Sequence, residues 1–361
     1  MDILTLIANM MRDGTLMRLA QNPLAQFGRP ARRYIGAELL PEIMVPENQF
    51  TEEAIRYRTI LANAGTRYSP TQKKSGDLIG SFDVKLAESD IAREFTGREY
   101  DALLRILGRN AEMEAVAQVT NWADTVLNLA LAEVNELWRW QALENAVVQL
   151  RGDNAYSEDV ALSNPAGHRV NVGGDWDDDA YDPFDDIYAM VDLLQSKGYT
   201  VSRIIASQAV ATKLARNTKA ANRAARVTIV GGAIQSTSRA SIAAINAVLA
   251  EDSIPPIERY DLRTRTQTGD QRFLSATSMV FVAETGRDVE LDIPDAEQNV
   301  VIPNALGYTA VGRAAGQSGP GRVIRAEAKF DKPPRIEGEA WQTSFPVIQD
   351  PEAVAVLKNI T

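Results

Sequence analysis

The chain has 361 residues and a formal net charge of −10 at pH 7, and its 45% hydrophobic and 24% charged residues are ordinary for a globular protein of about two domains. Because it has no cysteine, disulfides, thiolate metal sites and a cysteine nucleophile are excluded. The acidic excess argues against specific nucleic-acid binding, and no apolar run approaches the roughly 18 residues of a membrane span. The first twenty residues do not read as a signal peptide, so we expect a cytosolic protein with no membrane partner.

Residues 1–50 keep no long hydrophobic period. Turn-forming residues interrupt the segment at Pro23, Gly28, Pro30, Gly36, Pro41 and Pro46. We expect this segment to be an N-terminal arm that lies extended on another surface.

Residues 51–97 predict an extended β-hairpin loop. Side chains alternate with a period of two from Ile55 to Ile60 and again from Ser81 to Leu86, which places them on opposite faces of a ribbon. A ribbon of about forty residues folded in half reaches roughly 60 Å, and an isolated two-stranded ribbon is marginal in water. We expect it to clasp a neighbouring subunit, with an unstructured surface loop as the alternative. The side chains expected at this inter-subunit contact are Arg56, Tyr57, Arg58, Arg67, Lys73, Lys74 and Phe82.

Residues 111–150 predict one long helix that ends before Gly152. Apolar side chains recur three or four positions apart, and Trp122, Trp138 and Trp140 widen the apolar stripe. About forty residues at 1.5 Å each make a rod of roughly 60 Å. Because the stripe keeps no strict heptad, we expect the helix to pack against a sheet and not in a coiled coil.

A capped helix is predicted after a polar connector at 153–181. Asp182 precedes Pro183, two further aspartates occupy the first turn, and Lys197 and Gly198 close the pattern. Short strands and helices then alternate, as in a compact α/β or α+β region. The expected strands are 203–206, 257–261, 279–283 and 289–293, and the expected helices are 208–214 and 241–249.

The tail from Gly321 onward returns to long strands. Residues 323–330 and 336–344 alternate in the manner of β-strands and are separated by two prolines. We expect these two strands to pair with each other beneath the long helix, so that segments far apart in the sequence form one layer.

The only histidine, His168, lies in a turn-like stretch without a second ligand nearby. We therefore expect it to be a solvated loop residue. A Ser-His-Asp triad or a histidine metal site would have no other histidine to use.

Acidic residues gather between 175 and 186. Asp175, Asp177 and Asp179 have the first spacings of a calcium loop, but Ala180 stands where that loop requires Gly. Helix capping and solvation account for these acids. We expect no catalytic residue, no cofactor and no metal site, and hence no enzyme.

Short motifs follow one another in a fixed order along nearly the whole chain. They are Glu136-Leu137-Trp138-Arg139-Trp140-Gln141-Ala142-Leu143, Asp182-Pro183-Phe184-Asp185-Asp186-Ile187, Gly198-Tyr199-Thr200 with Ile204-Ile205-Ala206-Ser207, Lys332-Pro333-Pro334, Phe345-Pro346-Val347-Ile348 and Asp350-Pro351-Glu352-Ala353. With the order of arm, loop, long helix, α/β insert and closing strands, the chain resembles tailed-bacteriophage major capsid proteins of the lambda E-protein type.

The resemblance implies the Hong Kong 97-type capsid fold, an α+β fold. The implied parts are an N-terminal arm (1–50), an extended loop (51–97), a peripheral domain with the spine helix (98–172 and 321–361) and an α/β axial domain (173–320). It implies hexamers and pentamers in an icosahedral shell around double-stranded DNA, in a virion assembled in the host cytoplasm. A portal and a decoration protein are further implied partners. Because no large helical scaffolding segment is present, any scaffold is expected to be a separate protein.

Two other functions remain open from the sequence. A cargo-enclosing nanocompartment of the same fold would have nearly the same sequence features. An acid-dependent hydrolase would use the aspartates between 175 and 186. From the acidic net charge we also expect an acidic inner surface along which packaged DNA slides.

Overall fold

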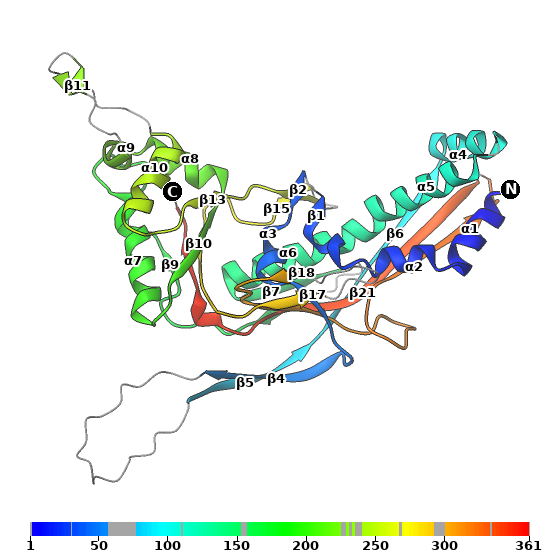
Figure 1. Cartoon of the computed structure of the whole chain (residues 1–361), viewed down its shortest axis with the longest axis horizontal. Helices are drawn as coiled ribbons and strands as arrows, with labels where there is room; N and C mark the ends of the chain where they lie inside the picture. Colours follow the sequence, from blue (N-terminus) through cyan, green and yellow to red (C-terminus); the bar gives the residue numbers. More distant parts are fainter. Residues whose placement is uncertain are drawn as a thin grey trace, which may run out of the picture.

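The computed structural model describes the chain except residues 1, 30, 57–76, 110, 153–156, 225–228, 231–232, 235–239, 267–268, 292–299, 333 and 361. Two sheets organise these residues, each covered by helices, and a two-stranded ribbon projects from the body (Figure 1). Within the described part, no helix has the length and apolar character needed to cross a bilayer.

The predicted long helix is present but ends earlier than expected. It comprises α5 (Glu112–Trp122), a π-helical turn (Ala123–Asn128) and α6 (Leu129–Asn145), and Ala146 closes it in the left-handed region at φ 52°. Residues expected to continue the helix instead form β7 (Val147–Arg151), paired with β8 (Ser157–Ala161). The expected end near 150 is therefore wrong, because two consecutive β-branched valines favour a strand.

Sheet A lies under the long helix and joins distant segments. Its central strand β21 (Arg335–Ile348) pairs with β20 (Val323–Lys329), β6 (Ala87–Thr96) and β19 (Gly307–Val311), and β3 (Glu42–Met44) runs parallel to β19. The predicted pairing of the two tail strands is confirmed. At Gly338 a Cβ would collide with the side chains of Trp122 and Leu127, so glycine here allows the helix to approach the sheet closely.

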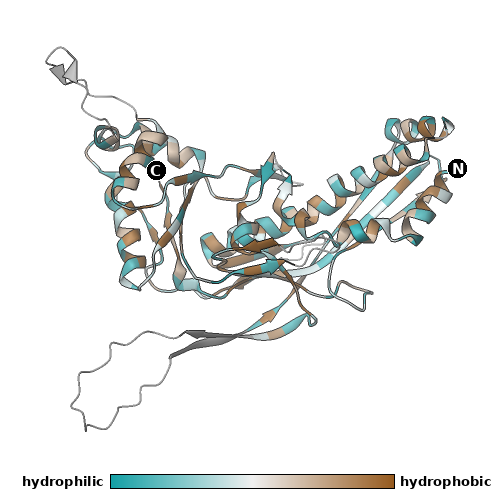
Figure 2. Ribbon diagram, in the orientation of Figure 1, coloured by the Kyte–Doolittle hydropathy of each residue, from teal (hydrophilic) through white to brown (hydrophobic). Residues whose placement is uncertain are grey.

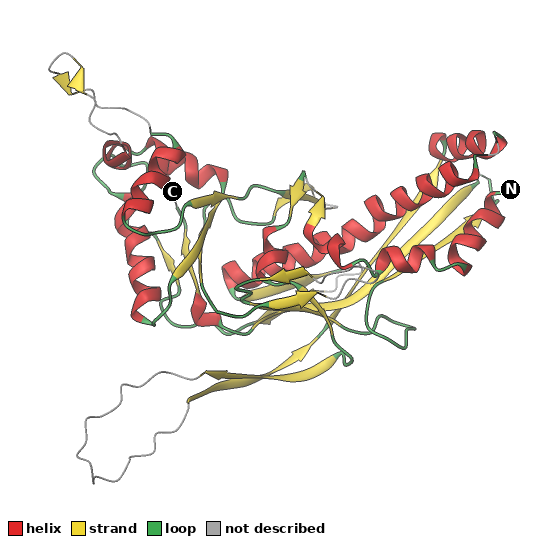
Figure 3. Cartoon of the chain, viewed as in Figure 1, coloured by secondary structure: helices red, strands yellow, loops and turns green. Residues whose placement is uncertain are grey.

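Most of residues 3–20 is helical, so the extended course expected for this segment is wrong. Helices α1 (Ile3–Arg12) and α2 (Thr15–Ala20) lie along sheet A beside β20 (Figure 3). Ile3, Leu6, Ile7 and Met10 are buried there. Their spacing of three and four is a helical period. This helical pattern covers too few residues to be recognised beside the prolines that follow it.

The remaining N-terminal segment reaches the centre of the molecule. It contains a 3-10 turn (Pro23–Phe27), the short ribbon β1 (Gly28–Arg29) and β2 (Arg32–Arg33), and helix α3 (Ile35–Leu39). Helix α4 (Arg98–Gly108) leads from β6 into α5.

Sheet B forms the second region. Its order is β13 (Ile257–Arg259), β10 (Val201–Ala206), β16 (Met279–Ala283), β22 (Val354–Lys358) and β9 (Arg169–Asn171). Around it lie α7 (Pro183–Ser196), α8 (Gln208–Arg216), α9 (Thr218–Ala224) and α10 (Ile242–Glu251). The capped helix predicted at Asp182 is confirmed, because the Asp182 carboxylate accepts a hydrogen bond from the Phe184 amide at 3.1 Å.

The sheets join segments that the expected boundaries separate. Strands β9 and β22 come from the ranges expected in the peripheral domain, but they lie in sheet B with strands of 173–320. Strand β19 comes from 173–320 but lies in sheet A. The apolar segments of both sheets stand out in Figure 2. Small ribbons complete the fold: β11 (Ile229–Val230) with β12 (Ala233–Ile234), β14 (Arg263–Thr266) with β15 (Gly269–Arg272), and β17 (Val289–Leu291) with β18 (Val300–Ile302), while a 3-10 turn (Pro351–Ala353) precedes β22.

Candidate functional site

The predicted hairpin projects from the body as β4 (Gln49–Arg56) and β5 (Asp77–Lys85) (Figure 1). The strands are antiparallel from Gln49 opposite Lys85 to Arg56 opposite Asp77, with a bulge between Ala54 and Ile55. A bulge increases the local twist of a ribbon. The described part of the hairpin is therefore a twisted ribbon that leaves the body without a covering layer.

The root of the ribbon is held by a short set of contacts. Val84 and Leu86 are buried. The Asn48 side chain donates to the Arg313 carbonyl at 2.9 Å and accepts from the Arg313 amide at 2.7 Å, while the Leu86 amide donates to the Asn48 carbonyl at 3.0 Å. A Cβ at Gly312 would collide with Asn48 and Leu86. The direction of the ribbon is thus set where it leaves the body.

The structure places two of the predicted contact residues on the ribbon's backbone. Arg56 is the last residue of β4, and Phe82 stands opposite Glu52 in β5. Tyr57, Arg58, Arg67, Lys73 and Lys74 lie outside the described residues. The inter-subunit role of all seven residues stays a prediction.

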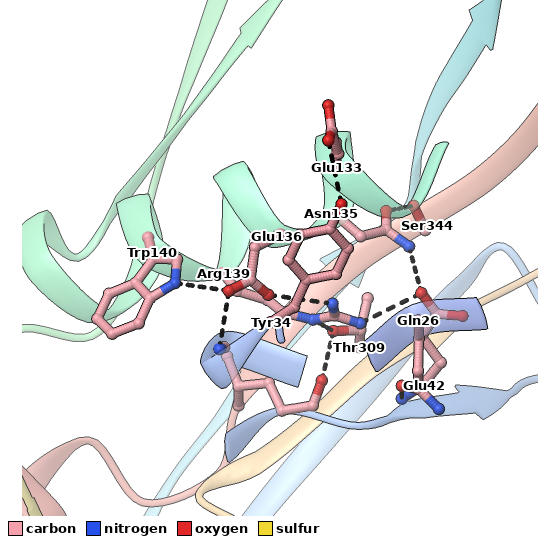
Figure 4. A network of polar contacts seen from close by, with 12 residues as sticks. Gln26, Tyr34, Glu42, Glu133, Asn135, Glu136, Arg139, Trp140, Thr309 and Ser344 are labelled. Atoms are coloured by element: carbon pink, nitrogen blue, oxygen red, sulfur yellow. Dashed lines mark hydrogen bonds and ion pairs between the residues drawn. The ribbon is translucent and has the colours of Figure 1, made fainter. Parts of the chain in front are cut away.

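A buried polar network connects the N-terminal segment to the rest of the molecule (Figure 4). Glu42 of β3 accepts hydrogen bonds from Arg139 at 3.2 Å, Arg322 at 2.5 Å and Asn135 at 2.8 Å. Arg139 also donates to Thr309 at 2.8 Å. Burial lowers the pKa of the Arg322 guanidinium, and the neighbouring Glu42 carboxylate opposes this shift.

The Glu136 carboxylate is a second centre of this network, one helical turn before Arg139 on the long helix. Its carboxylate accepts from the Gly36 amide at 2.9 Å, the Trp140 indole at 2.7 Å and the Tyr260 hydroxyl at 2.6 Å. Burial and the nearby Glu136 charge raise the pKa of Tyr260. Because Tyr260 directly follows β13 of sheet B, Glu136 joins the long helix, the N-terminal segment and sheet B.

The sequence contained a signal for this network that we did not interpret. Glu136 and Arg139 lie three residues apart among the tryptophans of the long helix, where charged side chains are not expected in an apolar stripe. Their partners Glu42 and Arg322 lie far away in the sequence. The network could therefore not be assembled from local patterns.

The aspartates between 175 and 186 make structural contacts. Buried Asp186 accepts from the Gly173 amide at 3.0 Å, the Trp176 indole at 2.8 Å and the Tyr181 hydroxyl at 2.7 Å. Asp177 pairs with Lys213 at 2.6 Å. The predicted capping holds at Asp182, whereas the solvation expected for the segment is wrong for Asp186, which is buried. The described residues contain no group of three acidic or histidine side chains that could hold a metal ion.

His168 is buried, so the expected solvated loop residue is wrong. Its Nδ1 lies 2.9 Å from the Val354 carbonyl oxygen, and its own carbonyl accepts from the Val356 amide at 2.7 Å. The residue precedes β9 at the edge of sheet B, and the pairing of β9 with β22 encloses it. A turn-like local sequence gave no sign of this long-range contact.

Solved structures share the fold of the chain. A protein from E. coli CFT073, described as a candidate prophage capsid protein, is 12% identical with a TM-score of 0.55, and 98% of each chain is covered. A phage-related protein from Bordetella bronchiseptica RB50 is 15% identical with a TM-score of 0.50, covering 93% of this chain and 95% of the other. No curated protein matches the chain.

The family assignment rests on sequence. The model of the family described as phage major capsid protein E matches residues 44–290, which include the projecting ribbon, the long helix and most of sheet B. The α+β arrangement is the Hong Kong 97-type capsid fold that the resemblance implied. The chain belongs to the phage major capsid protein E family.

Proposed function

We propose that this major capsid protein builds its shell by laying the β4–β5 ribbon of each subunit across a neighbouring subunit. The shell is icosahedral, consists of hexamers and pentamers, and encloses the double-stranded DNA of a tailed phage. A major capsid protein is a structural subunit of the virion shell, and the family match favours this role over a cargo compartment.

The observation that carries the proposal is the contrast between the ribbon's fixed root and its lack of a covering layer. An isolated two-stranded ribbon is marginal in water, so its stable state needs another surface. A neighbouring subunit supplies that surface. Many modest contacts of this kind add through multivalency into a stable shell.

Charge complementarity supports a partner surface for the ribbon's basic residues. On the face of sheet A opposite the long helix, Glu94, Glu337 and Glu327 lie side by side across three strands. Glu337 is paired with Lys329 and Arg335. Glu94 and Glu327 pair more loosely, with Arg335 at 3.5 Å and Arg325 at 3.7 Å, and remain more than half exposed. We propose that Arg56, Arg58 and Arg67 meet acids of this kind on the neighbouring subunit.

The remaining assignments follow the same proposal. The N-terminal arm (1–50) and the peripheral parts (98–172 and 321–361) form the outer region of each capsomer, and the axial region (173–320) packs around the symmetry axes. A separate scaffolding protein, a portal and a decoration protein complete assembly in the host cytoplasm. Contacts of Tyr57, Lys73, Lys74 and Phe82 with the neighbour belong to the proposed clasp.

A truncated ribbon tests the clasp. Replacing residues 53–81 with Asn-Gly keeps the root and closes Glu52 and Phe82 with a two-residue hairpin turn. We expect a folded chain with the circular dichroism and melting temperature of the parent that forms no particles in negative-stain electron microscopy. Particles at the parent's yield would contradict the clasp. A parent that stays monomeric with and without scaffold would contradict shell formation itself.

A further inference from the structure

A second ribbon, β14–β15, separates its side chains by type. Arg263 and Arg265 alternate with Thr264, so they face the opposite side of the ribbon. The Thr264 hydroxyl donates to Glu133 of the long helix at 2.6 Å, which fixes the threonine face toward the helix. The two arginines are consequently exposed on the outer face.

The neighbouring β1–β2 ribbon adds further arginines. Arg32 donates to the Arg263 carbonyl at 2.5 Å and pairs with Glu133 at 3.1 Å, so the two ribbons are in direct contact. Arg29 pairs with Asp124 at 3.5 Å. These arginines have acidic partners within the chain.

Arg263 and Arg265 have no such partner. Within the described part of the chain, neither guanidinium makes a hydrogen bond or an ion pair. The cross-strand neighbours are Arg272, which is itself paired with Asp261, and Asp270. One face of the ribbon thus carries Arg263 and Arg265 without an ion pair among the described residues, with Arg272 and Asp270 as their cross-strand neighbours, in a chain whose net charge is −10.

The arginine face and the projecting hairpin lie on opposite sides of the molecule. In Figure 1 the strands β1, β2 and β15 lie above helix α6, and the β4–β5 ribbon leaves below sheet A. A subunit whose hairpin reaches across its neighbour on one side therefore presents these arginines on the other.

We propose that Arg263 and Arg265 contact the phosphate backbone of the enclosed DNA, without reading its sequence; the inference rests on the proposed function. Alternate residues of a strand are roughly 6.8 Å apart, so two guanidinium groups on one face can each approach a phosphate of a duplex, which carries one charge per about 1.7 Å of helix axis. Duplex DNA offers such charges along its whole length. An acidic protein segment offers comparable charges only where acidic residues recur along the chain.

The contact modifies the expectation of a uniformly acidic inner surface. Most of the acidic chain repels DNA, and two arginines hold it locally and weakly. Because guanidinium binding releases counterions from phosphates, each contact lowers the slope of log affinity against log salt by about 0.9. The two arginines together therefore contribute about 1.8 to the magnitude of this slope.

The test measures fluorescence anisotropy of a short labelled duplex with the full, unassembled chain over a range of salt. Arg263→Gln with Arg265→Gln should reduce the salt slope by about 1.8. Arg109→Gln with Arg325→Gln removes the same charge from the C-cap of α4 and from β20 and should leave the slope unchanged. An unchanged slope in the first variant, or an equal loss in the control, overturns the proposal.

Labelled polyglutamate separates DNA from an acidic protein partner. We expect the parent to bind it more weakly than the duplex. If the parent binds polyglutamate as tightly as the duplex, and the arginine variant loses affinity for both ligands equally, the surface binds an acidic protein segment and the DNA proposal is refuted. Electron microscopy of both variants reports assembly independently, so a failure of shell formation is distinguished from a failure of this contact.

Discussion

The projecting ribbon and the buried network show two ways of using charged residues. Glu42, Arg139, Arg322 and Glu136 are nearly or fully buried and are bonded mainly to one another and to nearby polar groups of the same chain. The β4–β5 ribbon instead projects from the body, and Val84 and Leu86 are buried at its root. The comparison teaches that fold stability depends on the centre of the molecule, while the proposed contacts with other subunits depend on the ribbon.

The largest expected effect on stability is at Glu42. Glu42→Gln removes the carboxylate that pairs with buried Arg322 and one of the two carboxylates beside buried Arg139, which costs about 3–5 kcal/mol of unfolding free energy. Urea denaturation of the unassembled chain measures it. Glu47→Gln, at an exposed position close by, should change the free energy by less than about 0.5 kcal/mol. Equal effects of the two substitutions would remove the special role of the network.

A smaller loss is expected at Gly36. A Cβ there would lie 2.7 Å from the Glu136 carboxylate, so Gly36→Ala displaces that group and costs about 1–3 kcal/mol. Gly108→Ala is the matched control, because its Cβ meets open space at the end of α4. The control should be neutral or slightly stabilising. Thermal melting of both variants decides whether crowding at Glu136 matters.

The half-buried hydrogen bond between Tyr188 and Asp252 is expected to have a smaller effect on stability than these buried sites. Burial and the hydrogen bond to Asp252 raise the pKa of Tyr188 from 10.0 to about 12. A raised pKa stabilises the fold below 10.0, and this contribution is lost as the pH rises to about 12. After screening by solvent it amounts to less than about 1 kcal/mol. Denaturation of parent and Tyr188→Phe across this interval should show the smaller alkaline loss in the variant; identical losses would contradict the assignment.

The ribbon should show the smallest effect on stability and a large one on assembly. Reversing Arg56, Arg58 and Arg67 to Glu should change the unfolding free energy by less than about 0.5 kcal/mol, since these residues are predicted to contact another subunit. Particle counts by electron microscopy should fall sharply. Reversal of exposed Arg109 alone is the control that should preserve particles. Normal assembly of the triple variant would refute the predicted contact.

Local patterns predicted much of the fold. The capping residues at Asp182, the alternation at 323–330 and 336–344, and the stripe of the long helix correspond to α7, to β20 with β21 and to α5–α6. Each of these signals is complete within one segment. A period or a cap needs no distant partner to be recognised.

Other features depended on contacts that no local pattern contains. Helices α1 and α2 are buried against β20, which lies at the other end of the chain. His168 is enclosed because β22 pairs with β9. Val147 and Val148 leave the helix to pair with β8. In each case tertiary packing determined a local conformation that propensity left undecided.

The sequence by itself determined the periodic elements, the acidic balance and the order of motifs that places the chain among phage major capsid proteins. Only the tertiary structure decided which charged residues are buried together and which remain free. Glu42 and Arg322 are 280 residues apart and meet at 2.5 Å, while Arg263 and Arg265 lie in an arginine-rich neighbourhood and form no ion pair with the described residues. Charge composition is a property of the chain, but compensation of charge depends on distances that exist only after folding.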